Sequence, residues 1–187
     1  MLFEAMRLSA SSINSQPWKF VVIDSDEAKE RMHKTFANQH QYNQPHVFES
    51  SQIILFAYNP HYTRNDYSKV VDQYIEDKRV KTEDREGAYA AFRFAEMNTD
   101  ETGNTACWTK AQIYLALGNT LHTLARLKID STPLEGIDTE LVNEAFKKEL
   151  DGYQCDVALA IGYHHADDLN AKLPKSRLKM NKVLVRI

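Results

Sequence analysis

The longest regular segment of the sequence spans residues 106–127, and its apolar character constrains the fold more than any other stretch. Apolar side chains occur on nearly every side of the helix that this segment predicts: Trp108, Ile113, Tyr114, Leu115, Leu117, Leu121, Leu124 and Leu127. A helix that is apolar all round lies in a protein core or at an interface between subunits. Gly118 lowers helix stability in the middle of the segment, which predicts a close contact there.

The composition is typical of one globular domain, and we expect residues 1–187 to form it. The net charge of −3, with both signs interspersed, gives no support for a nucleic-acid partner or an anionic membrane. Cys107 and Cys155 match neither a disulfide framework nor a zinc site. The sequence contains no apolar run of membrane-spanning length and does not open on a secretory signal, so we expect a cytoplasmic protein.

Strand-like and helix-like segments are mixed along the chain. Short apolar runs predict strands at residues 18–23, 53–58 and 157–161, with a strand-like run at residues 183–187. Capping residues and apolar spacing predict helices after Asp24, over residues 67–75 and 88–97, and after Asp138. Asp24 is the predicted N-cap of the first helix, paired with Glu27. Pro133 and Gly136 predict irregular backbone over residues 131–137. The pattern indicates one α+β domain.

A polar loop precedes the first predicted strand and is a candidate ligand cradle. Ser11, Ser12, Asn14 and Gln16 offer hydrogen-bond donors and acceptors close together, and Pro17 excludes a helix at this point. Loops on a rigid scaffold commonly carry binding sites. Taken alone, the stretch is better interpreted as an ordinary connection between a helix and a strand.

Two other short motifs suit a phosphorylated, planar ligand. Lys175 and Arg177 flank Ser176, and in an extended segment both cations face one side, as binding of a phosphate dianion requires. Gly136, at the end of a short loop, lets a planar ligand approach the backbone closely. Taken alone, the first motif is more simply a solvated basic turn, and the second is a plain turn before a helix.

Several common catalytic and metal-binding motifs are absent from the sequence. It contains no GxSxG, HExxH, P-loop or GxGxxG pattern, so hydrolase, zincin and Rossmann interpretations lack support. His164 and His165 are adjacent and diverge in direction, and no thiol or carboxylate pattern completes a metal site around them. We interpret them as a surface pair and expect no metal.

Four segments, taken in order, resemble the FMN-dependent nitroreductases, most closely the oxygen-insensitive NAD(P)H nitroreductase/dihydropteridine reductase group. The segments are residues 11–18, Asn43, residues 133–136 and residues 173–178, and residues 108–119 are similar to the long central helix of that group. The resemblance covers essentially the whole chain. It implies a three-layer α+β fold with a central mixed, mostly antiparallel sheet flanked by helices. It also implies an intertwined homodimer with two active sites at the subunit interface.

The resemblance further implies that the cofactor is FMN and that two polar segments contact it. Ser11, Ser12 and Asn14 would line the flavin from one subunit. Asn43 and His46 would reach its pyrimidine side or its ribityl chain. His46 stands where close relatives have a lysine, so a titrating imidazole would replace a fixed cation near N1 and O2 of the flavin.

The remaining implied contacts come from later in the chain. The loop lying against the isoalloxazine ring would comprise Pro133, Leu134, Glu135 and Gly136, with a backbone N–H near Glu135–Gly136 donating to flavin N5. Lys175 and Arg177 would hold the phosphate. Phe94 matches a mobile aromatic residue on the substrate side of the flavin.

The implied reaction passes a hydride from NADH or NADPH through flavin N5 to a nitroaromatic, a quinone or a related small-molecule acceptor by a ping-pong mechanism. The flavin carries the redox step, so we assign no catalytic side chain. Family members normally open with a further helix that bears an Arg-x-Ser-type segment and a lysine, and this sequence begins after it. The alternative is therefore a flavin-poor, catalytically weak member that keeps the dimeric fold as a binding or structural protein.

Overall fold

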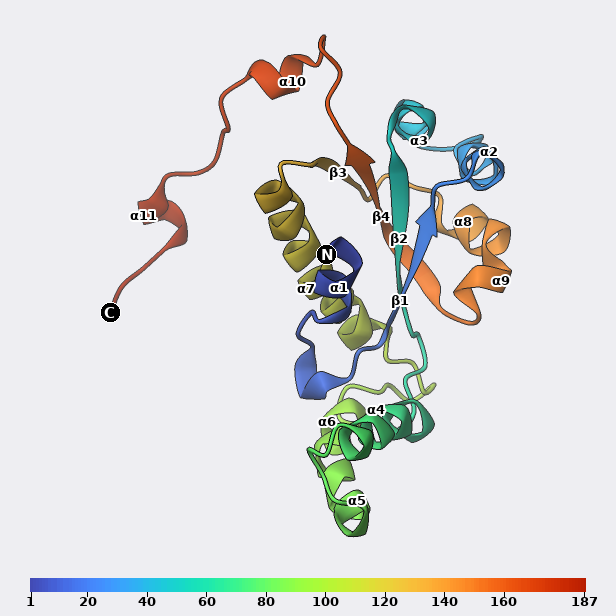
Figure 1. Ribbon diagram of the computed structural model, residues 1–187, viewed down its shortest axis with the longest axis vertical. Helices are drawn as coiled ribbons and strands as arrows, with labels where there is room; N and C mark the ends of the chain where they lie inside the picture. Colours follow the sequence, from blue (N-terminus) through green and yellow to red (C-terminus); the bar gives the residue numbers. More distant parts are fainter.

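The computed structural model describes residues 1–187 and contains a four-stranded sheet in the order β1-β2-β4-β3 (Figure 1). The strands are β1 (Trp18–Ile23), β2 (Gln52–Tyr58), β3 (Asp130–Leu134) and β4 (Gln154–Gly162). All neighbouring strands are antiparallel. Helices cover both faces of the sheet, so the predicted three-layer α+β fold with a mostly antiparallel central sheet is confirmed (Figure 1).

The two central strands, β2 and β4, are apolar on both faces because a helical layer covers each face. In β2, side chains alternate between the two cores: Ile53, Leu55 and Ala57 face one, and Ile54, Phe56 and Tyr58 face the other. This confirms the expectation from the continuous apolar run. A bulge interrupts the pairing of β2 with β4, because Phe56 pairs with Val157 and Ala57 pairs with Cys155, which leaves Asp156 as the extra residue.

One helical layer consists of α1 (Leu2–Arg7) and α7 (Ala106–Leu127), which lie side by side on the sheet (Figure 1). The long helix predicted over residues 106–127 is confirmed, but it buries only the side facing the sheet and α1. Leu115 is 54% exposed. A Cβ placed on Gly118 would meet no atom within 4 Å, so the close contact predicted there is wrong within the single chain.

The opposite layer consists of α2 (Asp26–Lys34), α3 (Pro45–Glu49), α8 (Thr139–Ala145) and α9 (Lys147–Leu150) (Figure 1). The predicted N-cap Asp138 is confirmed, because its side chain accepts from the N–H of Leu141. The predicted N-cap Asp24 is wrong. Ser25 takes that role, since its backbone is extended and its Oγ accepts from the N–H of Ala28, three residues further along.

A small helical unit extends beyond one end of the sheet (Figure 1). It contains α4 (Arg64–Glu76), η3 (Thr82–Asp84), α5 (Arg85–Ala88), η4 (Tyr89–Phe92) and α6 (Arg93–Glu96). The helix predicted over residues 67–75 is confirmed within α4. The helical conformation predicted over residues 88–97 is confirmed for residues 88–96, although residues 89–92 form a 3-10 turn and not an α-helix. That turn places Tyr89 and Phe92, three residues apart, on the same buried side.

Two predictions for the last third of the chain are also wrong. Pro133 lies inside β3, not in irregular backbone, because β3 pairs with β4 alone and an edge strand tolerates the missing N–H. The strand-like run at residues 183–187 forms no strand, since the chain after β4 leaves the sheet and meets no strand edge (Figure 1). This tail carries α10 (Leu169–Lys172) and α11 (Met180–Val183). None of the helices in the structure has the length and apolar character needed to cross a membrane.

Candidate functional site

The turn that follows β3 is held closely against η2 (Gln41–Asn43). The side-chain Nδ2 of Asn43 donates to the carbonyl oxygen of Gly136 over 2.9 Å. A Cβ on Gly136 would lie 2.6 Å from Oη of Tyr42 and 2.8 Å from Nδ2 of Asn43, closer than real side chains approach. An added Cβ would force the ends of the Tyr42 and Asn43 side chains to move, so a glycine at position 136 favours this close contact.

The same turn is also held from α7. The hydroxyl of Tyr114 donates to Oε1 of Glu135 over 2.6 Å. Partial burial and this carboxylate both raise the pKa of Tyr114, so the phenol stays protonated and remains a donor at neutral pH. Asn43 and Tyr114 thus fix two consecutive residues of the turn from two different elements.

The turn keeps two backbone donors free of protein partners. The carbonyl of Glu135 accepts from the N–H of Ile137 over 2.9 Å, whereas the N–H groups of Glu135 and Gly136 donate to no protein acceptor. Free N–H groups in a fixed turn without an intervening Cβ suit an acceptor atom of a planar ligand. The structure therefore offers, at Glu135–Gly136, the type of donor that the resemblance to FMN-dependent nitroreductases implies for flavin N5.

The second polar segment, residues 11–16, contains η1 (Ser12–Asn14) and an unusual backbone. Ile13, Asn14 and Gln16 have φ values of 52°, 55° and 46°. Positive φ is rare for residues other than glycine, and a β-branched residue such as Ile13 is strained there. Such conformations persist when surrounding contacts determine them, and they concentrate at ligand-binding loops.

Three buried side chains supply those contacts. Oε1 of Gln112, on α7, accepts from the N–H of Ser12 over 2.8 Å. The hydroxyl of Tyr62 donates to the carbonyl of Ser15 over 2.6 Å. The hydroxyl of Tyr67, on α4, donates to the carbonyl of Ile13 over 3.3 Å, and burial raises the pKa of Tyr67 to about 12.

The two polar segments lie on different sides of α7. Gln112 contacts the first segment and Tyr114 contacts the turn after β3. Two residues along an α-helix differ by roughly 200° in direction, so these side chains project to opposite sides. The structure therefore joins Asn43 with Glu135 and Gly136, and it does not bring Ser11, Ser12 and Asn14 of the same chain to them.

Two other predicted site residues lie in partly exposed positions. His46 is half-buried in the first turn of α3, directly after η2 and therefore near Asn43 along the chain. Phe94, on α6, is 44% exposed. Its ring meets that of Trp108 edge to face, with 6.2 Å between the ring centroids. Trp108 is buried, and its Nε1 has no hydrogen-bond partner.

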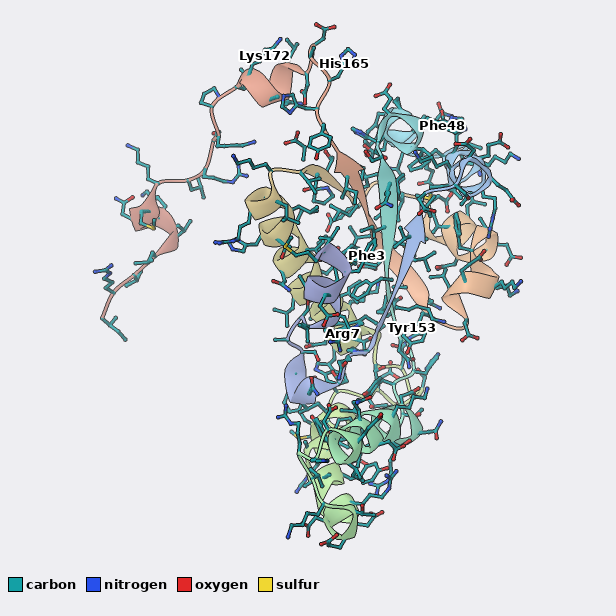
Figure 2. The ribbon with its side chains drawn as sticks, viewed as in Figure 1. Phe3, Arg7, Phe48, Tyr153, His165 and Lys172 are labelled. Atoms are coloured by element: carbon teal, nitrogen blue, oxygen red, sulfur yellow. The ribbon has the colours of Figure 1, made fainter.

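The predicted phosphate ligands Lys175 and Arg177 lie in the exposed C-terminal tail. This tail, in which Figure 2 labels His165 and Lys172, runs away from the sheet. Nη1 of Arg177 donates to the neighbouring carbonyl of Ser176 over 2.6 Å. Within one chain, the tail does not bring these two cations to Asn43 or to Gly136.

Sequence reasoning missed the tyrosines that hold both segments. Tyr67 and Tyr114 occupy apolar positions of helices, and this pattern predicts only that they pack in the core; Tyr62 lies in no predicted helix or strand. The available signal was the hydroxyl group, because a buried tyrosine needs a hydrogen-bond partner and so points to a nearby backbone carbonyl or carboxylate.

Known proteins share both the sequence pattern and the fold. The Nitroreductase family model matches residues 1–163. The major NAD(P)H-flavin oxidoreductase of Aliivibrio fischeri is 60% identical over 98% of this chain and 85% of its own length. The oxygen-insensitive NAD(P)H nitroreductase of Salmonella typhimurium is 33% identical over 97% of this chain and 85% of its own length.

A presumed nitroreductase from Exiguobacterium sibiricum, solved in complex with FMN, has the same fold. It superposes with a TM-score of 0.81 at 24% identity, covering 100% of this chain and 84% of that protein. The family match extends over the strained loop, η2, the turn after β3 and all four strands. The chain belongs to the nitroreductase family.

Proposed function

We propose that this chain is an FMN-dependent oxidoreductase that passes a hydride from NADH or NADPH to nitroaromatic, quinone or related acceptors by a ping-pong mechanism. The single observation that carries the proposal is the Glu135–Gly136 turn. Two elements fix this turn, the glycine at position 136 allows η2 to approach it closely, and two backbone N–H groups remain available to an acceptor. The names of relatives at 60% and 33% identity support the same activity.

The residues present suit FMN by the chemistry of their donors. The turn would donate to N5, the atom at which bound flavin accepts and delivers the hydride. Asn43 and His46 would face its polar pyrimidine or ribityl part. Lys175 and Arg177 would bind the phosphate, for which guanidinium and ammonium groups are well suited. No side chain of the chain is required as nucleophile, acid or base.

The proposed site requires a second copy of the chain. Ser11, Ser12 and Asn14 lie on the other side of α7 from the turn after β3, so they cannot complete the site of their own chain. A homodimer in which each copy offers its strained loop to the turn of the other would bring both polar segments to one flavin. The exposed Leu115 and the open space at Gly118 on α7 are consistent with such a contact. A cytoplasmic location remains a prediction.

The direct test is a visible absorption spectrum of the purified protein, followed by titration with FMN. Trp18 and Trp108 provide an intrinsic fluorescence signal. We expect a yellow protein, saturable FMN binding, and oxidation of NAD(P)H in the presence of a nitroaromatic or a quinone. Parallel double-reciprocal plots would support the ping-pong order. A colourless protein that stays inactive with added FMN would reject the proposal and favour the flavin-poor alternative.

The phosphate assignment has its own test. Lys175→Ala and Arg177→Ala should each weaken binding of FMN but not of riboflavin, which lacks the phosphate. Lys172→Ala, in the same exposed tail, is the matched control. Equal FMN affinity in both variants and wild type would remove Lys175 and Arg177 from the site without touching the assignment of the turn.

A further inference from the structure

Four ionisable side chains form a connected group between α7 and the turn after β3. Lys110 and Tyr114 are four residues apart on α7, so they project from the same face of the helix. Nζ of Lys110 lies 2.5 Å from Oδ1 of Asp156. The hydroxyl of Tyr114 donates to Oε1 of Glu135 over 2.6 Å. The helix face is thus tied both to β4 and to the turn.

The position of Asp156 depends on the bulge in β4. As the extra residue between two paired neighbours, Asp156 escapes the strict alternation of the strand, and a bulge of this kind redirects a side chain. The side chain of Asp156 is only 18% exposed, so its charge needs a partner. Lys110 supplies that partner while its Nζ lies 4.8 Å from the ring centroid of Tyr58.

We propose that Tyr114 is a positioning residue for the cofactor-binding turn, and that the Lys110–Asp156 pair fixes the helix face from which it acts. This inference rests on the proposed function, because the turn matters only if its N–H groups donate to flavin N5. The turn lies outside any helix or strand, so side-chain contacts set its conformation. Asn43 holds the carbonyl of Gly136, and Tyr114 holds the side chain of Glu135.

The test compares two flavins in the Tyr114→Phe variant. FMN accepts a hydrogen bond at N5, whereas 5-deaza-FMN has a C–H group at that position and cannot accept one. Loss of one hydrogen bond corresponds to about a fivefold change in an equilibrium constant. We therefore expect the Kd for FMN to rise about fivefold and the Kd for 5-deaza-FMN to change little. The matched control is Tyr163→Phe, since Tyr163 is 75% exposed and its hydroxyl makes no hydrogen bond.

A second variant makes the result independent of one substitution. Glu135→Ala removes the other end of the same hydrogen bond, so the effects of Tyr114→Phe and Glu135→Ala on the FMN Kd should not add in the double variant. Additive effects, an unchanged FMN Kd in Tyr114→Phe, or equal weakening of both flavins would overturn the inference while the proposed function stands. Failure of the wild-type protein to bind either flavin would overturn both.

Discussion

The side-chain amide of Asn43 donates to the carbonyl of Gly136 across 2.9 Å, although 93 positions separate the two residues. Asn43 ends η2, which lies between α2 and α3 on one face of the sheet, whereas Tyr114 reaches the same turn from α7 on the other face. The turn after the edge strand β3 is therefore held by both helical layers. Two side-chain hydrogen bonds thus anchor a short segment that lies outside any helix or strand.

Gly136→Ala should disrupt the turn and weaken FMN binding. The new Cβ would lie 2.6 Å from Oη of Tyr42 and 2.8 Å from Nδ2 of Asn43, so both side-chain ends must shift and the hydrogen bond from Asn43 to Gly136 should be lost. Loss of that hydrogen bond costs about 1 kcal/mol, which urea unfolding would measure. We expect about a fivefold rise in the FMN Kd. In the control Gly87→Ala, the Cβ meets open space on α5 and both quantities should stay near wild type. Wild-type values for Gly136→Ala would contradict the geometry.

The sequence predicts three of the four strands and the major helices because their patterns are local. The continuous apolar run at Ile53–Tyr58 indicates a strand buried on two faces, and the run at 106–127 indicates a long helix. The wrong predictions arise where tertiary contacts determine the secondary structure. Pro133 is tolerated in a strand because that strand is an edge, and the position of an edge depends on the whole sheet.

The sequence proposes residues for the candidate site but gives no information about their arrangement. Asn43 and Gly136 are both predicted to contact the flavin, and the structure places them in direct contact with each other. Their spacing along the chain gives no information about the distance between them. The positive φ values at Ile13 and Asn14 were equally unpredictable, because Ile13 disfavours them and they arise from hydrogen bonds to Tyr67 and Gln112.

Tyr62→Phe should loosen the strained loop. The substitution leaves the carbonyl of Ser15, a buried residue, without its 2.6 Å donor, and an unpaired buried acceptor costs about 1–3 kcal/mol. We expect a lower free energy of unfolding and faster amide hydrogen exchange over residues 11–16. Tyr153→Phe is the control, because the hydroxyl of Tyr153 makes no hydrogen bond in the structure. Unchanged exchange in the loop would show that Gln112 and Tyr67 suffice to hold it.

Asp66→Ala should destabilise α4 at neutral pH and much less in acid. Oδ2 of Asp66 accepts from the N–H and the hydroxyl of Thr63, completing a capping box. Burial raises the pKa of Asp66, but these hydrogen bonds outweigh burial and hold the pKa below its usual value. A lowered native pKa means that the carboxylate contributes stability above about pH 4, the usual carboxyl range. That contribution is lost as the pH falls through the lower native value.

The measurement is urea unfolding of wild type and Asp66→Ala between pH 7 and pH 3. Loss of the hydrogen bonds that the Asp66 carboxylate accepts from Thr63 costs about 1 kcal/mol, so this difference is expected at pH 7 and should shrink toward pH 3. Glu76→Gln, at the other end of α4, is the control, because Glu76 is exposed and its side chain makes no hydrogen bond. A difference that stays constant with pH would mean that the ionised form of Asp66 has no special role.

Phe94→Ala should change the use of electron acceptors more than it changes stability. Phe94 is 44% exposed and has one edge-to-face contact, with Trp108 at 6.2 Å between centroids. Loss of such a pair costs about 1 kcal/mol, a small part of the stability of a domain. If Phe94 covers the substrate side of the flavin, its removal should raise the KM for aromatic acceptors several-fold and alter the fluorescence of Trp108. Met97→Ala, 75% exposed just after α6, is the matched control. An unchanged KM for nitroaromatics and quinones, together with altered Trp108 fluorescence, would show that Phe94 only packs against Trp108.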